Sequence, residues 1–154
     1  TELMLQKNNM SEAEREEFLD RFSEESDRTL VAFGIMGGIF GEGIDLKNDR
    51  LIGAIVVGTG LPQISNERTI LKDYYDAENG WGFYYAFRYS GINKVLQAAG
   101  RVIRTTEDTG VILLLDERFW QREYDLLYPR EWSDRKPCNI ANVGKLVADF
   151  WEQI

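Results

Sequence analysis

The sequence predicts an α/β fold in which a parallel sheet is flanked by helices. Three apolar runs, at 29–36, 51–58 and 111–115, have the length and near-continuous hydrophobicity of strands that are covered on both faces. Helical patterns separate these runs, and strands that alternate with helices favour a parallel sheet. The chain has 154 residues, the size of one domain, and its 44% hydrophobic content is enough for a packed core. We therefore expect a single domain over residues 1–154.

A short strand and an acidic helix are expected before the first of these runs. Residues 3–5 have the apolar character of a strand. Ser11, with Glu14 three residues later, is the signature of a capping box, so we expect a helix over about 11–25. Eight acidic residues stand against two arginines between 11 and 27, which is typical of a solvated helix face.

Helices are also expected after the second and third apolar runs. Apolar residues at helical spacing predict a helix over 66–76. The pattern over 82–104 predicts one kinked helix or two consecutive helices, with an interruption near 89–91. Further helices are expected over 122–127 and 142–151.

An aromatic cluster lies at the start of the pattern that begins at residue 82. Its rings could stack on the bases of a single strand, with Arg88 and Lys94 nearby, or they could pack in the core. The sequence leaves both alternatives open. The aromatic residues concerned are Trp81, Phe83, Tyr84, Tyr85, Phe87 and Tyr89.

A glycine-rich segment follows the first buried strand, at a position where open α/β sheets bind ligands. It is not a dinucleotide fingerprint, because the third glycine would have to stand at Leu46. It is not a complete phosphate-binding P-loop, because Ile44 and Asp45 stand where lysine and a hydroxyl residue are needed. The glycines of this candidate site are Gly37, Gly38, Gly41 and Gly43.

The segment Gln97-Ala98-Ala99-Gly100-Arg101-Val102-Ile103-Arg104 is the strongest candidate for function. We expect Arg101 and Arg104 to share one face of a helix, with Gln97 one turn before Arg101 and with Gly100 leaving room for a close approach. Paired guanidinium groups on a rigid element suit anions with several oxygens, phosphates above all. The alternative is a pair of surface salt bridges.

Composition excludes several classes of site. The formal net charge of −8 argues against nucleic-acid binding by bulk charge, and we expect at most weak binding of single-stranded DNA by the chain alone. There is no histidine and only Cys138, which excludes an intramolecular disulfide, histidine catalysis and a His/Cys metal site within this chain. No apolar run is long enough to cross a membrane, and we expect a cytoplasmic protein with no membrane partner.

Two ordered motifs resemble those of a known family. Gly41-Glu42-Gly43-Ile44-Asp45 follows a buried strand, Leu61-Pro62 follows the next, and Gln97-x-x-Gly-Arg-x-x-Arg104 comes later. Together, over about 3–119, they resemble the second motor domain of a superfamily two helicase, most closely the XPD/DinG-like DNA helicases. The resemblance implies a RecA-like, P-loop NTPase-like fold that lacks its own Walker A motif.

The resemblance also implies residue roles. Arg101 or Arg104 would act as an arginine finger on the γ-phosphate of ATP, and the first motif would couple the nucleotide cleft to the DNA track. Stabilisation of a phosphoryl-transfer transition state by arginines from a second body agrees with this chemistry. The residues implied to line the nucleotide are Glu42, Gly43, Asp45, Gln97 and Gly100.

The departures from the family pattern imply partners. The chain has neither G-K-[ST] nor Asp-Glu-x-His, so ATP and Mg²⁺ would be held mainly by a missing N-terminal motor domain. An iron–sulfur cluster, if the parent protein has one, would lie in that other part. The chain starts at Thr1 and opens directly on an apolar pattern, so we expect a fragment of a longer protein. We expect this fragment to be monomeric. The resemblance implies single-stranded DNA as the partner of the longer protein.

Two other functions remain open from the sequence. One is a catalytically inert, helicase-like module that binds a partner protein, which the retention of both Arg101 and Arg104 disfavours. The other is a small flavodoxin-like or related nucleotide-binding enzyme, which the missing phosphate loop disfavours.

Overall fold

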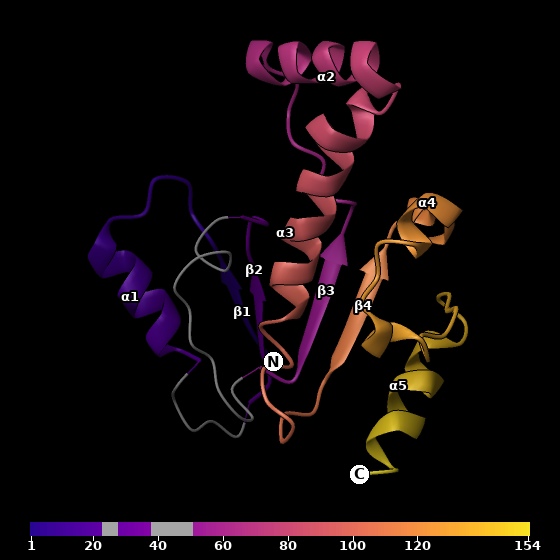
Figure 1. The fold of residues 1–154 in the computed structure, drawn as a ribbon. Helices are drawn as coiled ribbons and strands as arrows, with labels where there is room; N and C mark the ends of the chain where they lie inside the picture. Colours follow the sequence, from indigo (N-terminus) through magenta and orange to yellow (C-terminus); the bar gives the residue numbers. More distant parts are fainter. Residues whose placement is uncertain (23–27, 38–50) are drawn as a thin grey trace. The chain divides into compact units, whose positions relative to one another are not determined.

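The structure is a computed structural model, and it describes residues 1–22, 28–37 and 51–154 (Figure 1). These residues form two compact units, Thr1–Phe119 and Trp120–Ile154. The first unit contains the strands and the predicted arginine segment, and the second contains short helices.

The first unit is built on two pairs of parallel strands. β1 (Glu2–Leu5) pairs with β2 (Leu30–Phe33), and β3 (Gly53–Val57) pairs with β4 (Val111–Leu115). The two arrows of each pair point the same way in Figure 1. Each pair is joined by a connection that contains a helix, as parallel pairing requires. The predicted α/β class with parallel strands and flanking helices is therefore confirmed.

The first helix, α1 (Glu12–Asp20), begins with the predicted capping box. Ser11 Oγ accepts a hydrogen bond from Glu14 N at 3.3 Å, and Glu14 Oε2 accepts one from Ser11 N at 2.8 Å. The helix ends at Asp20, before the predicted end near residue 25. After it, Phe22 N bonds three residues back to Leu19 O at 3.0 Å, and Arg21 pairs with Glu2 on β1 at 2.5 Å. Residues 23–27, which include the predicted end, lie outside the described part.

A helical hairpin connects β3 to β4. It consists of α2 (Asn66–Asn79), the π-helix η2 (Tyr84–Arg88) and α3 (Tyr89–Ala99). The expected irregularity is real, but it occupies η2 and precedes the predicted position at 89–91. Gly80, with φ of 76°, ends α2 in the left-handed conformation that favours glycine.

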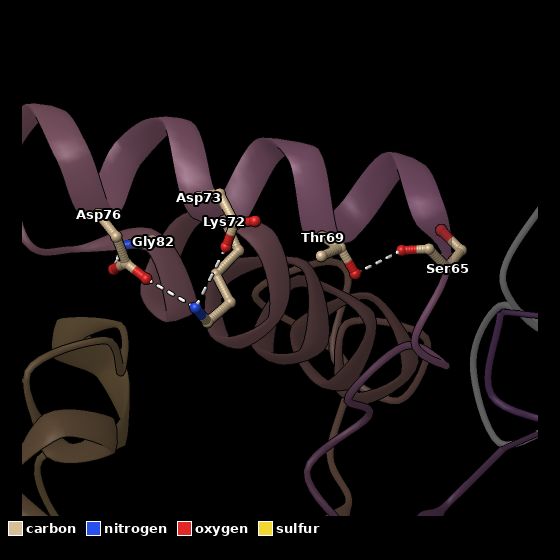
Figure 2. A network of polar contacts seen from close by, with 6 residues as sticks. All are labelled: Ser65, Thr69, Lys72, Asp73, Asp76 and Gly82. Atoms are coloured by element: carbon tan, nitrogen blue, oxygen red, sulfur yellow. Dashed lines mark hydrogen bonds and ion pairs between the residues drawn. The ribbon is translucent and has the colours of Figure 1, made fainter.

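A polar network fixes the turn of this hairpin (Figure 2). Asp76 accepts from Lys72 Nζ at 2.7 Å through one carboxylate oxygen and from Gly82 N at 2.8 Å through the other. A Cβ atom on Gly82 would overlap the carbonyl oxygen of Lys72. The turn therefore depends on a carboxylate at position 76 and on the missing side chain at position 82. Near the amino-terminal end of α2, Arg68 donates a hydrogen bond to Ala86 O and so ties α2 to η2.

The helix α3 packs on β3 through a contact between two glycines. A Cβ atom on Gly60 would lie 2.7 Å from Gly91 O, and one on Gly91 would lie 2.6 Å from Thr59 O. Gly60 also has φ of 68°. Glycine is needed at both positions because the two backbones meet without space for a side chain. The buried apolar side chains around this contact come from α3 and β3, namely Val56, Ile92, Val95 and Ala99.

The aromatic cluster at 81–89 is packed only in part, so core packing accounts for some of its rings, and the alternative of stacking on bases stays a prediction. Phe87 is buried, whereas Trp81, Phe83 and Tyr85 are 49%, 41% and 42% exposed. Tyr85 is stacked on Tyr75 of α2, with ring centroids 4.3 Å apart. Part of the cluster is therefore packing material for the hairpin, and part faces solvent.

The second unit contains short helices. The 3₁₀ helix η3 (Glu117–Trp120) leads into it, followed by α4 (Arg122–Asp125), η4 (Arg130–Trp132) and α5 (Val143–Trp151). The predicted helices at 122–127 and 142–151 are thus present with slightly different ends. In the part of the chain that the structure describes, no helix has the length and apolar character needed to span a bilayer.

We expect Gly91→Ala to lower the free energy of unfolding. The new methyl group would meet the carbonyl oxygen of Thr59, and overpacking of this kind costs about 1–3 kcal/mol. Gly144→Ala is the control, because no atom lies within 4 Å of its added Cβ, and alanine in a helix should stabilise by up to about 1 kcal/mol. Urea denaturation followed by circular dichroism compares the two; equal midpoints would contradict the close approach of α3 to the loop after β3.

We expect Asp76→Ala to destabilise the hairpin at neutral pH and to have little effect in strong acid. The hydrogen bond from Lys72, followed by that from Gly82 N, lowers the pKa of Asp76 in the folded protein. A lowered carboxyl pKa stabilises the fold above the unfolded value of about 3.9, and this contribution is lost as the pH falls through the folded pKa. Thermal unfolding of both proteins at neutral pH, and then at decreasing pH from the unfolded pKa of about 3.9 down to about 2.5, measures how the destabilisation by Asp76→Ala shrinks.

Asp73→Ala is the matched control for this experiment. Asp73 reaches the same lysine at 3.5 Å, whereas the hydrogen bond from Gly82 N in the network of Figure 2 goes to Asp76. We expect a smaller loss than for Asp76→Ala. Equal losses in the two variants would show that the contact with Gly82 N does not stabilise the turn.

Candidate functional site

The arginine segment lies at the end of α3 and beyond it. Gln97 is on the last turn of α3 and is exposed, and α3 ends at Ala99. The exposed Gly100 caps the helix by donating from its backbone N to Leu96 O at 2.8 Å. Arg101 N then donates to Ala98 O at 3.2 Å, so Arg101 lies in a tight turn.

The expectation that Arg101 and Arg104 share one helix is therefore wrong. Arg104 lies past the turn, where the chain has left the helix. The helix ends before Arg104 is reached, because Arg101 N and Val102 N each bond three residues back, to Ala98 O at 3.2 Å and to Ala99 O at 3.0 Å. Beyond this turn, Asp108 Oδ2 accepts hydrogen bonds from Arg104 N at 2.9 Å and from Thr105 N at 2.7 Å. For the helix to continue, these two donors would have to bond to the carbonyl groups of Gly100 and Arg101. The nearby carboxylate offers them a different partner.

Two buried contacts hold this segment against the strands. Val102, between the arginines, is only 3% exposed. A Cβ atom on Gly110 would overlap Val102 and would lie 2.8 Å from Ile52 O, so the loop approaches the start of β3 as closely as glycine allows. Val111 N donates to Ile52 O at 3.0 Å and starts the pairing of β4 with β3. The segment is thus anchored at the amino-terminal edge of the β3–β4 pair.

The four described residues predicted for this site therefore belong to one short, anchored stretch. Arg101 and Arg104 are both half-buried, which leaves part of each side chain accessible. Guanidinium groups on an anchored backbone can present several N–H donors to the oxygens of a phosphate. The four residues are Gln97, Gly100, Arg101 and Arg104.

The glycine-rich segment is described only where it begins. Gly37 has φ of 84°, and a Cβ atom there would lie 3.6 Å from Lys94 Cδ of α3. The segment therefore begins beside α3. The other predicted residues of this segment lie outside the described residues, namely Glu42, Gly43 and Asp45.

Sequence reasoning missed Asp108 and Gly110. The signal for Asp108 was weak, since a Thr and an Asp three residues apart in a polar turn are common and many such pairs cap their own backbone. Gly110, directly before an apolar strand, indicated a turn but not a contact with Ile52 and Val102. Both roles depend on segments that are distant in sequence or on the path of the chain after α3.

A charged pair, Asp116 and Arg118, lies just beyond the carboxyl-terminal end of β4. Asp116 accepts from Arg118 Nε at 2.8 Å and from Arg118 Nη2 at 2.6 Å. The side-chain hydrogen bond from Arg118 holds the pKa of Asp116 below its usual value. Since β4 separates this pair from Arg104, the carboxylate of Asp116 is not placed to neutralise the arginine segment. Across the described ranges, no group of three or more acidic, cysteine or histidine side chains could hold a metal ion.

Comparison with known proteins shows the family to which this sequence belongs. Residues 1–135 match the helicase C-terminal domain family. The chain is 32% identical over 145 residues to the "ATP-dependent DNA helicase XPD" of Sulfolobus acidocaldarius. The aligned region covers 88% of this chain and 24% of that protein.

Two further relatives agree with this match. The "ATP-dependent DNA helicase DinG" of Photobacterium profundum is 32% identical over 101 residues, 64% of this chain and 14% of that protein. The "Regulator of telomere elongation helicase 1 homolog" of Caenorhabditis briggsae is 29% identical over 143 residues, 85% of this chain and 14% of that protein. The chain thus spans less than a quarter of the length of each of these relatives. It belongs to the helicase C-terminal domain family and is related to the XPD/DinG-like helicases of superfamily two.

Proposed function

We propose that this chain is the second motor domain of an ATP-dependent DNA helicase and that it supplies the arginines that complete the ATPase site. The observation that carries the proposal is the anchored stretch from Gln97 to Arg104, in which two half-buried arginines follow the end of α3. The matched relatives are named as ATP-dependent DNA helicases, which supports ATP as the nucleotide and DNA as the track.

The arginines would act on ATP that is held mainly by a first motor domain. Negative charge on the γ-phosphate oxygens is redistributed during phosphoryl transfer, and an arginine brought in from a second body stabilises that transition state. Arg101 and Arg104 are the candidates for this arginine finger, and Gln97 and Gly100 would line the same side of the cleft. Hydrolysis would then depend on closure of the two domains.

The metal and the DNA have different places in this proposal. The described residues contain no carboxylate cluster suited to a cation, so we assign Mg²⁺ to the first domain. A chain with one cysteine cannot provide the ligand set of an iron–sulfur cluster, so a cluster would also belong elsewhere in the parent. Glu42, Gly43 and Asp45 are proposed to couple the nucleotide cleft to single-stranded DNA, as the family resemblance implies.

The isolated chain should not hydrolyse ATP. Its sequence has no P-loop lysine, and a phosphate cradle from a second body is needed before the arginines can act. Steady-state phosphate release by the purified 154-residue chain, with and without single-stranded DNA, measures this. Turnover that is lost on mutation of a residue of this chain would contradict the assignment as a second motor domain.

In a protein that joins this chain to its first motor domain, Arg104→Ala or Arg101→Ala should lower kcat steeply. The scale for arginine fingers in other phosphoryl-transfer enzymes is about 10³–10⁵ in kcat. ATP affinity should change little, because the first domain holds the triphosphate. Lysine should restore little activity, since its ammonium group cannot supply the planar fork of a guanidinium.

Arg122→Ala is the control for this measurement. Arg122 lies in α4, in the other compact unit, and is outside the proposed site. If Arg101 and Arg104 were only surface ion-pair partners, their loss would cost about 0–1 kcal/mol of stability and leave turnover near normal. Near-normal kcat in both alanine variants would remove the motor assignment and favour the inert interaction module.

A further inference from the structure

The two arginines of the proposed site are held in place by different contacts. Arg101 belongs to the tight turn at the end of α3, where its backbone N donates to Ala98 O at 3.2 Å. Arg104 lies three residues later, and its backbone N donates to a side chain, Asp108 Oδ2, at 2.9 Å. The position of Arg104 therefore depends on a residue that neither the sequence motif nor the family resemblance assigned.

The geometry around Asp108 is that of a backbone clamp. A single carboxylate oxygen accepts from two consecutive N–H groups, those of Arg104 and Thr105, at 2.9 and 2.7 Å. Hydrogen bonds to an ionised acceptor are shorter and stronger than neutral ones. Two of them on adjacent residues restrict the peptide that joins the two donors and so set the direction in which the Arg104 side chain leaves the backbone.

Packing contacts fix the chain on both sides of this clamp, so the clamp controls the backbone that lies between them. On one side, the buried Val102 fixes the chain two residues before Arg104. On the other side, Gly110 lies against Ile52 and fixes the chain two residues after Asp108. Between these anchors, Glu107 N also donates to Thr105 Oγ1 at 3.3 Å, a bond that does not involve the backbone of Arg104.

We propose that Asp108 is a positioning residue that orients Arg104 for contact with phosphate, while Arg101 is oriented independently by the end of α3. The inference rests on the proposed function for its catalytic consequence, but the clamp itself is a property of this chain. The simpler interpretation is that Asp108 only stabilises a surface loop. That interpretation predicts lower thermal stability for Asp108→Ala, with no specific effect on the chemical step.

The first arm of the test uses the 154-residue chain without nucleotide. Hydrogen exchange, resolved at single amides by NMR, compares Asp108→Ala with the matched control Thr105→Ala. We expect Asp108→Ala to speed exchange at the Arg104 and Thr105 amides and to leave the Arg101 amide unchanged. Thr105→Ala should affect the Glu107 amide and leave that of Arg104 as in the parent chain. Unchanged exchange at Arg104 in Asp108→Ala would overturn the proposal.

The second arm measures ATP turnover in the protein that includes the first motor domain. A misplacement of about 1 Å at a catalytic group can cost about 10²-fold in rate, so kcat of Asp108→Ala should fall by about that factor while KM for ATP stays nearly constant. Asp108→Asn should recover part of the loss, because its amide oxygen can accept both hydrogen bonds without the charge. Thr105→Ala should retain normal kcat.

Double variants separate positioning from general loop stability. If Asp108 acts through Arg104, adding Asp108→Ala to Arg104→Ala should lower kcat no further, whereas adding it to Arg101→Ala should lower kcat again. An equal additional loss in both backgrounds would overturn the proposal. If Arg104→Ala alone left kcat normal, the catalytic part of this inference would be overturned, whereas the proposed function fails only if Arg101→Ala also leaves kcat normal; the hydrogen-exchange arm would still decide whether Asp108 clamps Arg104.

Discussion

The packing of α3 on β3 is the constraint on which the rest of the first unit depends. At the start of α3, Gly91 and Gly60 approach each other with no room for a side chain at either position. This contact sets the distance between α3 and the loop after β3, and the buried residues along α3 keep the helix packed as far as Ala99. The arginine stretch follows directly from that end, so a contact at one end of α3 determines where the candidate phosphate-binding groups lie. The two regions are coupled through a rigid helix of 11 residues.

Local basicity in an acidic chain is consistent with a shared active site. A net charge of −8 would repel nucleotides and DNA at long range, so affinity cannot come from bulk charge. Two arginines on an anchored stretch can still act at short range, where direct hydrogen bonds to phosphate oxygens dominate. In the proposed function, another domain brings the phosphate to these groups. The proposal thereby reconciles an acidic chain with a phosphate-binding role.

Several expectations from sequence were accurate because they depend on local chemistry. The capping box of Ser11 and Glu14 needs only residues three apart, and the strands β3 and β4 follow from continuous apolar runs. Element ends were less predictable. The hydrophobic pattern continues through Val102 and Ile103, so it predicted helix as far as Arg104, whereas α3 ends at Ala99 and Asp108 accepts the hydrogen bond of Arg104 N. Periodicity reports which faces are apolar and contains no information on a competing side-chain acceptor.

Composition, short-range spacing and the order of motifs along the chain were enough to predict the α/β class, the family and the arginine motif. How the motif is held became visible only in the folded chain. The separate placement of Arg101 and Arg104, the clamp by Asp108 and the contact of Gly110 with Ile52 all require knowing where the chain goes after α3. That path is set by backbone contacts between segments about 30 to 60 residues apart, such as Gly60 with Gly91 and Ile52 with Gly110, and spacing along a sequence does not record such contacts.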